Sequence, residues 1–525
     1  MKNLECDVVV VGAGPVGLSL AHQLAQEGVD TILLEKNTEI VREPRAVGLD
    51  GESIRTWQAV GLLEQLQPHI HFRLGGRYYN AEGEELFWLN YEGQEPCGYP
   101  VKQSFDQGET DLVLANSLIE RESARLLFGH EVISYSQDSE HVTAEVREHN
   151  GELQTINARF LVGCDGGRST VRRLMGVSMT GEVNDFPWLV IDTRDPVFVD
   201  GPTVMFFCDP KRPGMTLRIT PEYRRWEWML LPGESEAELL DEKKIHSLIA
   251  PFTDVSQVEI FRKRVYSFSA VIADRWQDGR VLLAGDSAHM TPPFAGQGLN
   301  AGIRDTRNLF WKIALVVKGQ ADLRLLDTYE LERREHTREL IEFAVRLGEK
   351  IQPLDTQQAA ERDRMFAELR KEPQALQDYL NDLTKPQRIQ SLDSGVVAPL
   401  HQHKLHGQYV LQPRLTLEDG SLQLLDELLG PGFCIMGYGC DPEAELPAEV
   451  LANWRNMGAR TLAVADSDAT TGWPRDLTGT LAEQFQALAP VMVLIRPDRF
   501  IISAFTRENF DRGLDAARDA LSMKG

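Results

Sequence analysis

The alternation of apolar and polar positions divides the N-terminal part of the chain into short structural segments. An apolar run, Asp7–Val11, is followed by glycines, by an amphipathic stretch that ends near Gln26, and by a second apolar run, Thr31–Leu34. Short apolar runs bounded by turn residues are typical of buried strands, whereas a period of about 3.6 residues is typical of helices. This segment therefore predicts a β-α-β unit.

The same two periodicities predict the elements that follow. Helical spacing marks Ser53–Gln67 and Ser117–Leu127, and the intervening Phe72–Tyr99, rich in Gly, Tyr and acidic residues, predicts loops and short strands. Glu131–Leu161 alternates like hairpin strands, with a polar HNG turn at residues 149–151.

A long region of strands occupies the middle of the chain, about Trp188–Ser269. Three runs within it alternate well enough to form a sheet: Val204–Phe207, Thr216–Ile219 and Trp226–Leu231. A sheet inserted between two nucleotide-binding segments is a candidate platform for a substrate.

Helices are predicted after residue 286, where they extend through Lys318 and over Leu325–Gly348 and Thr356–Leu383. Ser391–Gln412, with its proline and three histidines, is the best linker candidate. Beyond it, Leu415–Arg499 alternates strand-like and helical runs, which predicts a small α/β unit of its own.

Composition and charge narrow the class of protein. At 525 residues the chain is too long for one ordinary core. A formal net charge of −24 argues against a general affinity for nucleic acid or anionic membranes. No apolar run reaches the about 18 residues that span a bilayer, and the N-terminal apolar run ends in a glycine-rich turn instead of a signal-peptide cleavage site. A soluble protein with no membrane span is expected.

The six cysteines are scattered without CxxC spacing, so neither a zinc site nor a disulfide framework is predicted. A reducing cytoplasm is the expected location. Three histidines in the linker, His401, His403 and His406, lack a supporting carboxylate pattern, so we interpret them as solvated and predict no metal.

A glycine-rich turn lies between the first predicted strand and helix. It contains Gly12, Gly14 and Gly17, and Glu35 ends the next strand. The first glycine permits a tight turn, the second lets amides approach a pyrophosphate, and the third allows close packing. The helix N-terminus favours phosphate charge, and Glu35 can accept hydrogen bonds from a ribose 2′-OH. The pattern predicts an adenine dinucleotide, either FAD or NAD.

Two later segments distinguish between these cofactors. Residues 160–172 form an apolar strand that runs into a DGxxSxxR turn at Asp165, and residues 280–289 deliver Asp286 into a second tight turn. Taken alone, each would be interpreted as a capped turn. Together with the glycine turn they resemble, in order and spacing, the three signatures of the flavoprotein aromatic hydroxylases.

The resemblance continues through the PPFAGQGLNAG segment at residues 292–302 and covers nearly the whole chain. Within the family, the sequence is most similar to 3-(3-hydroxyphenyl)propanoate hydroxylase and related phenol hydroxylases. It implies an α/β fold with a Rossmann-type FAD-binding domain, an inserted, mostly antiparallel β-sheet for the substrate, and a C-terminal thioredoxin-like domain. The expected boundaries are 1–180 and 271–390 for the two parts of the FAD-binding region, 181–270 for the sheet and 400–525 for the last domain. Because the last domain lacks CxxC, a structural role or a role in oligomer contacts, such as a homodimer, is expected.

The resemblance also implies roles for individual residues. Asp286 would bond the FAD ribitol, and Arg45, Gln107 and Asp165 would contribute to cofactor binding. Gly298, Leu299 and Asn300 would approach the flavin ring, and Gly296 and Gln297 would also bind the cofactor.

Residues at the reacting face are predicted from their place in the chain. Pro293, Phe294 and Gly298 are candidates for the catalytic face, because they lie in or directly before the flavin contact. Arg212, Arg218, Tyr266 and Pro293 are candidates for contact with the substrate, although packed strand residues or solvated arginines would give the same pattern. His289 is more typical of a structural hydrogen-bonding residue than of a base.

The reaction implied by the resemblance uses NADH or NADPH and O₂. Reduced FAD would bind O₂ as a C4a-hydroperoxyflavin and hydroxylate a small phenolic compound, with the cofactor supplying the difficult chemistry. Residues 226–232 faintly resemble a halogenase strand, but the lysine that halogenases need is missing between Lys36 and Lys102. A non-enzymatic flavin-binding sensor is the alternative from another class.

Overall fold

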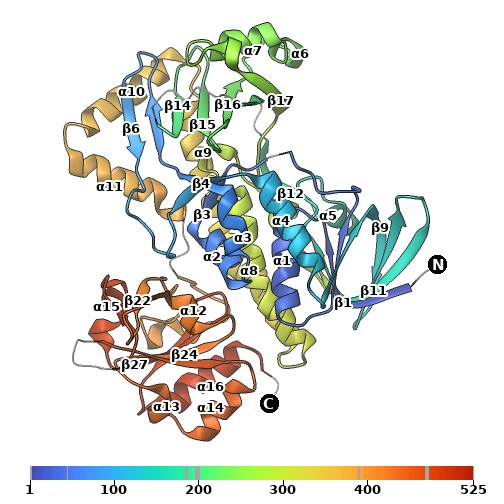
Figure 1. The fold of residues 1–525 in the computed structure, drawn as a ribbon, viewed down its shortest axis with the longest axis vertical. Helices are drawn as coiled ribbons and strands as arrows, with labels where there is room; N and C mark the ends of the chain where they lie inside the picture. Colours follow the sequence, from blue (N-terminus) through green and yellow to red (C-terminus); the bar gives the residue numbers. More distant parts are fainter. Residues whose placement is uncertain are drawn as a thin grey trace.

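The structure is a computed structural model (Figure 1), in which residues 3–43, 45–183, 187–194, 202–387, 391–466 and 472–523 are described. It contains two large sheets, a set of long helices and a C-terminal unit. The α/β class predicted from the sequence is confirmed.

The first large sheet carries the predicted β-α-β unit. Strand β1 (Asn3–Val11) runs parallel to β2 (Thr31–Glu35) on one side and to β11 (Leu153–Gly163) on the other, and α1 (Pro15–Gln26) connects β1 to β2. The other strands of the sheet are β8 (Ala124–Phe128), β9 (His130–Gln137), β10 (Val142–Glu148), β19 (Gln277–Asp278) and β20 (Val281–Leu283). The carboxyl ends of β1, β11 and β20 therefore meet at one edge, where ligands bind in open α/β sheets.

The predicted helix over residues 117–127 is wrong. Helix α4 spans Gln107–Ile119, capped by the Asp106 side chain, which accepts a hydrogen bond from Glu109 N. Ala124–Phe128 is instead strand β8, because pairing with β2 overrides its helical spacing. The helix expected over Ser53–Gln67 is divided into α2 (Gly51–Ala59) and α3 (Leu63–Leu66) at Gly61, whose φ is +77°.

The second large sheet has seven strands and lies at the top of Figure 1. Its order is β17 (Glu259–Tyr266), β13 (Trp188–Arg194), β16 (Tyr223–Met229), β15 (Gly214–Arg218), β14 (Val204–Phe207), β5 (Gly76–Tyr79) and β6 (Glu85–Leu89). All neighbours are antiparallel except β14 and β5. The sheet thus exceeds the predicted interval 181–270, because β5 and β6 come from the earlier region that we expected to hold loops and short strands.

Long helices link the two sheets. Helix α8 (Gly298–Val317) packs against α1 and runs through the middle of the molecule, and α9 (Asp327–Ile351) crosses it. Beyond α9, the predicted helix over 356–383 is interrupted at Pro373 to give α10 (Thr356–Leu369) and α11 (Pro373–Thr384). These two helices cover one face of the seven-stranded sheet, where Phe366 stacks on Phe87 with ring centroids 4.5 Å apart.

The C-terminal unit, coloured orange to red in Figure 1, has its own four-stranded sheet. The order is β25 (Arg460–Val464), β24 (Cys434–Tyr438), β27 (Val491–Ile495) and β28 (Ile501–Phe505). β24 and β25 are parallel, and the other two pairs are antiparallel. Helix α14 (Ala448–Arg455) connects the parallel pair, and α16 (Phe510–Ala520) follows the last strand.

Buried ion pairs join the C-terminal unit to the rest of the chain. Arg496 binds Glu332 of α9 at 2.7 Å, and Glu332 also binds Lys312 of α8 at 2.9 Å. A second cluster pairs Arg55 of α2 with Asp426 at 2.6 Å. These side chains are almost completely buried, so the unit is firmly docked and is not a flexibly tethered appendage.

No helix in the described part of the chain combines the length and the apolarity needed to cross a bilayer. The linker is less solvated than expected: His401 is exposed, but His406 is buried and its Nδ1 lies 3.0 Å from Pro399 O.

Candidate active site

The glycine turn at the end of β1 is shaped by close backbone approaches. Gly12 has φ +104°, and a Cβ there would lie 2.6 Å from Cys164 O; a Cβ on Gly17 would lie 2.0 Å from Gly12 O. Gly14, by contrast, has open space beside it. It is the N-cap of α1 and no side chain caps the helix, so the N–H groups at this end are available to an anion.

Glu35 lies beside this turn at the end of β2. Its Oε2 accepts a hydrogen bond from Ala13 N at 2.9 Å, and its Oε1 accepts one from Asn37 N at 2.9 Å. Glu35, the predicted ribose-binding carboxylate, therefore also stabilises the glycine turn through its hydrogen bond from Ala13 N.

Hydrogen bonds connect the turn at Asp165 to the second turn, Gly285–Ser287, which carries Asp286. Asp165 caps α5 (Thr170–Leu174): its carboxylate accepts hydrogen bonds from Ser169 Oγ at 2.5 Å and from Thr170 N at 2.6 Å. Arg172 then donates to Ser287 O at 2.9 Å, next to Asp286. Asp165 lies against Gly12, so its contacts fix the shape of the cleft wall.

Asp286 differs from the other carboxylates of this region. Its side chain is exposed at the end of β20 and, among the described residues, has no hydrogen-bond partner. Crowding by surrounding protein raises its pKa, while the charges of His289 and Arg45 act to lower it. An exposed carboxylate without a hydrogen-bond partner among the described residues is a suitable acceptor for ligand hydroxyl groups.

Gln107 positions the loop that carries Arg45. Its Oε1 accepts hydrogen bonds from Arg45 N at 2.9 Å and Ala46 N at 2.8 Å, and its Nε2 donates to Asp111 at 3.1 Å. The predicted cofactor residue Gln107 thus acts on the backbone, whereas the exposed Arg45 side chain faces the Asp286 region.

Asp111 makes the stability of this arrangement depend on pH. Burial raises the pKa of its carboxyl to about 8, so the folded protein holds a proton that the unfolded chain loses near pH 4. This contribution is complete below about pH 4 and is lost as pH rises to about 8, by up to about 1.4 kcal/mol per pH unit. We expect Asp111→Asn to remove that slope.

Denaturant titrations of both proteins from pH 5 to pH 9 would measure the slope. The account requires the stability of Asp111→Asn relative to wild type to grow as pH rises to about 8. Parallel stability profiles would show that Asp111 is already ionised in the folded protein at pH 5.

The segment predicted to contact the flavin ring begins α8. Pro293–Ala295 form a 3-10 turn, Gly296 has φ +57°, and Gln297 precedes the helix without capping it through its side chain. Gly298 faces open space, and Leu299 is partly exposed. A second uncapped helix N-terminus therefore lies close to that of α1, since a Cβ on Gly302 would lie 2.6 Å from Val16, and its positive dipole end favours developing negative charge.

Asn300 fixes this helix end to strand β3 (Gly48–Asp50). It is fully buried; its Nδ2 donates to Gly48 O at 3.2 Å and Gly296 O at 2.9 Å. Its Oδ1 accepts from Asp50 N at 3.0 Å. The Asn300 side chain is thus occupied in holding the loop and β3 together.

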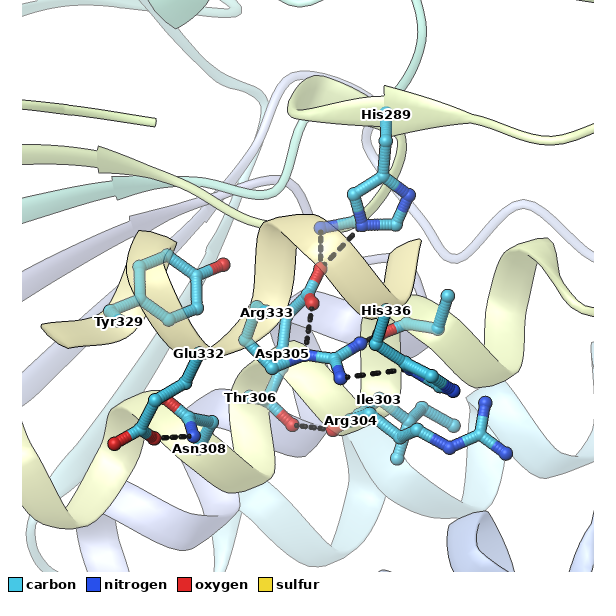
Figure 2. Close-up of polar contacts among 12 residues, drawn as sticks. His289, Ile303, Arg304, Asp305, Thr306, Asn308, Tyr329, Glu332, Arg333 and His336 are labelled. Carbon is cyan, nitrogen blue, oxygen red and sulfur yellow. Dashed lines mark hydrogen bonds and ion pairs between the residues drawn. The ribbon is translucent and has the colours of Figure 1, made fainter. Parts of the chain in front are cut away.

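Asp305 connects the second turn to the long helices (Figure 2). Its Oδ2 lies 2.7 Å from His289 Nε2 and accepts from Gly285 N at 3.0 Å, and its Oδ1 accepts from Arg333 Nε at 2.9 Å. Burial alone would raise the Asp305 pKa, but His289 and Arg333 lower it overall. His289 is therefore a structural partner of Asp305, which orients the turn that carries Asp286.

The candidate substrate residues have different surroundings. Phe294 packs between Trp188 and Phe268, with ring centroids at 5.6 and 6.1 Å, which places the loop against the seven-stranded sheet. Arg212 is tied to Glu234 and donates to Met229 O at 2.9 Å. The Arg212 guanidinium is therefore engaged by the protein itself, through Glu234 and the carbonyl of Met229.

The two remaining candidates contact other side chains of the region. The guanidinium of Arg218 lies over the Phe72 ring at 4.5 Å, and the Tyr266 hydroxyl accepts a hydrogen bond from Arg262.

One buried cluster in the sheet was missed by the sequence analysis. Asp192 binds Arg225 at 2.7 Å and Arg262 at 2.7 Å, and Arg225 donates to Arg45 O at 3.0 Å. The cluster therefore connects the sheet to the Arg45 loop. Its only signal in the sequence is an Asp at the end of an otherwise apolar strand run.

These features together fit FAD. Two uncapped helix N-termini could take its pyrophosphate and the oxygen edge of its ring, while Glu35 and Asp286 supply acceptors for its hydroxyl groups. Gly14 and Gly298 leave room for close approach.

Comparison with known proteins supports this assignment. The model of an FAD binding domain matches residues 5–344, and that of the HcaD C-terminal domain matches residues 407–520. The chain is 36% identical to a 3-(3-hydroxy-phenyl)propionate/3-hydroxycinnamic acid hydroxylase of Burkholderia cenocepacia strain HI2424, over 98% of this chain and 97% of the relative.

Solved structures share the fold. The OxyS anhydrotetracycline hydroxylase from Streptomyces rimosus is 27% identical, with a TM-score of 0.76 over 99% of this chain and 100% of that one. The flavin-dependent monooxygenase PieE, in complex with FAD and substrate, is 20% identical, with a TM-score of 0.81 over 99% of each chain, and shows the fold alone. The chain belongs to the family of FAD-dependent aromatic hydroxylases, which are flavoprotein monooxygenases.

Proposed function

We propose that this enzyme hydroxylates a phenolic aromatic compound with NAD(P)H and O₂. The observation that carries the proposal is that the uncapped N-termini of α1 and α8 lie beside the turn that carries Asp286: a Cβ on Gly302 of α8 would lie 2.6 Å from Val16 of α1 and 3.0 Å from Gly285 Cα. Relatives that match 98% of this chain are hydroxylases of 3-(3-hydroxy-phenyl)propionate and 3-hydroxycinnamic acid, which supports the same class of substrate.

The residues of this chain would bind FAD, orient the substrate ring and shield the reacting atoms from water. When bound, FAD supplies the redox chemistry that activates O₂ and transfers one oxygen atom to the ring. The N–H groups at Gly298 and Leu299 would stabilise negative charge at the ring edge, and Asp286 would hold the ribitol chain. Pro293 and Phe294 would form the wall that excludes water and places the substrate ring.

We infer a monocyclic phenolic acid as the substrate, which would become a catechol or a hydroquinone. Tyr266 and Pro293 are the candidates to contact it, whereas the ion pair with Glu234 weakens the case for Arg212. Larger polycyclic phenols are the competing substrate class.

A panel of phenols tests the function. With FAD-loaded protein, we expect a phenolic acid to stimulate NAD(P)H oxidation at least about tenfold and to yield a hydroxylated product, because ring binding completes the water-excluded site. Matched aromatic acids without the phenol hydroxyl should give neither effect. If no member of a broad panel stimulates oxidation, the protein is a flavin-binding protein with another role.

The finer architecture forms part of the proposal. The strand order and directions of the C-terminal sheet, with α14 between its parallel strands, support a thioredoxin-like unit, and without CxxC a structural role is favoured. Two exposed leucines of this unit, Leu422 in β23 (Leu422–Leu424) and Leu477 just after β26 (Arg475–Asp476), support a homodimer contact. Free cysteines throughout the chain support a cytoplasmic location.

A further inference from the structure

Lys102 places an ammonium group against the loop that leads into α8. It begins strand β7 (Lys102–Phe105), where it pairs with Asp50 of β3. Its Nζ donates a hydrogen bond to Ala295 O, nearly two hundred residues later in the chain. A lysine therefore bridges the two segments, β3 and residues 295–300, that flank the candidate flavin site.

The loop is shaped around this ammonium group. A Cβ on Gly296 would lie 3.1 Å from Lys102 Nζ and 3.3 Å from its Cε, and a Cβ on Gly48 would lie 3.4 Å from Cε. The φ of +57° at Gly296 also favours glycine. Since Asn300 binds the carbonyls of both glycines, the lysine and the asparagine hold the same pair of backbone segments.

The charge of Lys102 is not neutralised within the described part of the chain. An ammonium group has three donors, and Ala295 O is the single acceptor that contacts it. Asp50 attracts it from β3, but Asp50 is itself paired with Arg304 of α8, which repels Lys102. Burial lowers the Lys102 pKa to about 8, with Asp50 raising it and Arg304 lowering it. A partly buried cation without a paired anion is costly unless a ligand supplies the negative charge.

We propose that Lys102 supplies the positive charge that offsets the negative charge gained by FAD on reduction. Hydride transfer from NAD(P)H delivers two electrons and one proton, so that oxidised FAD gains one negative charge and the nicotinamide becomes NAD(P)⁺. The proposal rests on the proposed NAD(P)H-dependent function. It assigns Lys102 as a positioning and electrostatic residue for the first half of the reaction, which stabilises the reduced cofactor without donating a proton to it.

The test compares flavin reduction potentials in three variants of the FAD-loaded protein. Lys102→Met should lower the equilibrium constant for flavin reduction about tenfold or more, which lowers the reduction potential by about 30 mV for a two-electron couple. Lys102→Arg should retain most of the wild-type potential. Lys243→Met, at an exposed position of α7 (Glu242–Ile249), removes the same charge far from the cleft and should leave the potential unchanged.

Two results would overturn the assignment. One is a Lys102→Met potential that moves no further than that of Lys243→Met; the other is an equal loss in Lys102→Arg. An unchanged potential together with weaker binding of an anionic phenol would show that the charge serves the substrate, and the proposal would be wrong. Because the potential is measured without turnover, a failure to hydroxylate phenols would not affect this result.

A measurement on wild type keeps the proposal testable if Lys102→Met does not fold. Lys102, between Asp50 and Arg304, should be protonated below about pH 8 and should take up a proton on reduction above it. The slope of the potential against pH should therefore steepen above about pH 8 by one proton per two electrons. A slope that does not steepen up to pH 10 contradicts the proposal.

Discussion

Replacing Asp286 with alanine is expected to release FAD. The variant loses an acceptor for ligand hydroxyl groups, and hydrogen bonds to a charged group contribute about 1.5–3 kcal/mol. The dissociation constant for FAD should therefore rise about 10- to 100-fold. Fluorescence titration of the apoprotein with FAD measures this change, and FAD content after gel filtration is a second readout.

The same substitution should not destabilise the apoprotein, which separates a ligand contact from a structural role. Asp286 has no hydrogen-bond partner among the described residues, and crowding already disfavours its charge. Asp286→Asn keeps an acceptor and should have an intermediate effect on FAD binding. Unchanged FAD affinity in the alanine variant would remove Asp286 from the cofactor site.

Replacing Arg496 with methionine is expected to cause a large loss of stability. Arg496 lies fully buried between Glu332 and Asp498, at 2.7 and 2.5 Å, and its removal leaves two carboxylates short of a partner. Burial alone would raise the Glu332 pKa, but Arg496 and Lys312 hold it well below its usual range. The Glu332 carboxylate is therefore ionised at neutral pH and pairs with the Arg496 cation. Breaking a buried pair of this kind costs about 3–5 kcal/mol.

Arg507→Met is the matched control, because Arg507 forms a surface pair with Glu445 at 3.8 Å in the same unit. Exposed pairs contribute about 0–1 kcal/mol. Urea or thermal unfolding monitored by circular dichroism should show a large shift for Arg496→Met and almost none for Arg507→Met. Equal shifts would mean that the buried cluster does not fasten the C-terminal unit.

The cofactor half of the site was predictable from the sequence because its signals are local. Gly12, Gly14 and Gly17 lie within one turn; close backbone approaches require glycine at Gly12 and Gly17, and Gly14 leaves open space at the helix N-terminus. Asp286 likewise lies in the tight turn Gly285–Ser287, just after β20, and precedes the loop that leads into α8. The role of each of these residues can therefore be predicted from a short segment of the sequence.

The parts that could not be predicted depend on contacts between distant segments. Lys102 gains its position only when β7 meets a loop nearly two hundred residues later, and Arg496 meets Glu332 across a similar separation. Strand β8 was misassigned for a related reason, since pairing with β2 outweighed its helical spacing. Local periodicity has no information about such partners.

With FAD bound at this site, the enzyme would transfer one oxygen atom of O₂ to a phenol. The most direct test is a reaction under ¹⁸O₂ with FAD-loaded protein, NAD(P)H and the phenolic acid that stimulates oxidation most. The account predicts one ¹⁸O atom in each product molecule and close to one product per NAD(P)H consumed. Release of all the oxygen as hydrogen peroxide, with no labelled product from any phenol tested, would contradict it.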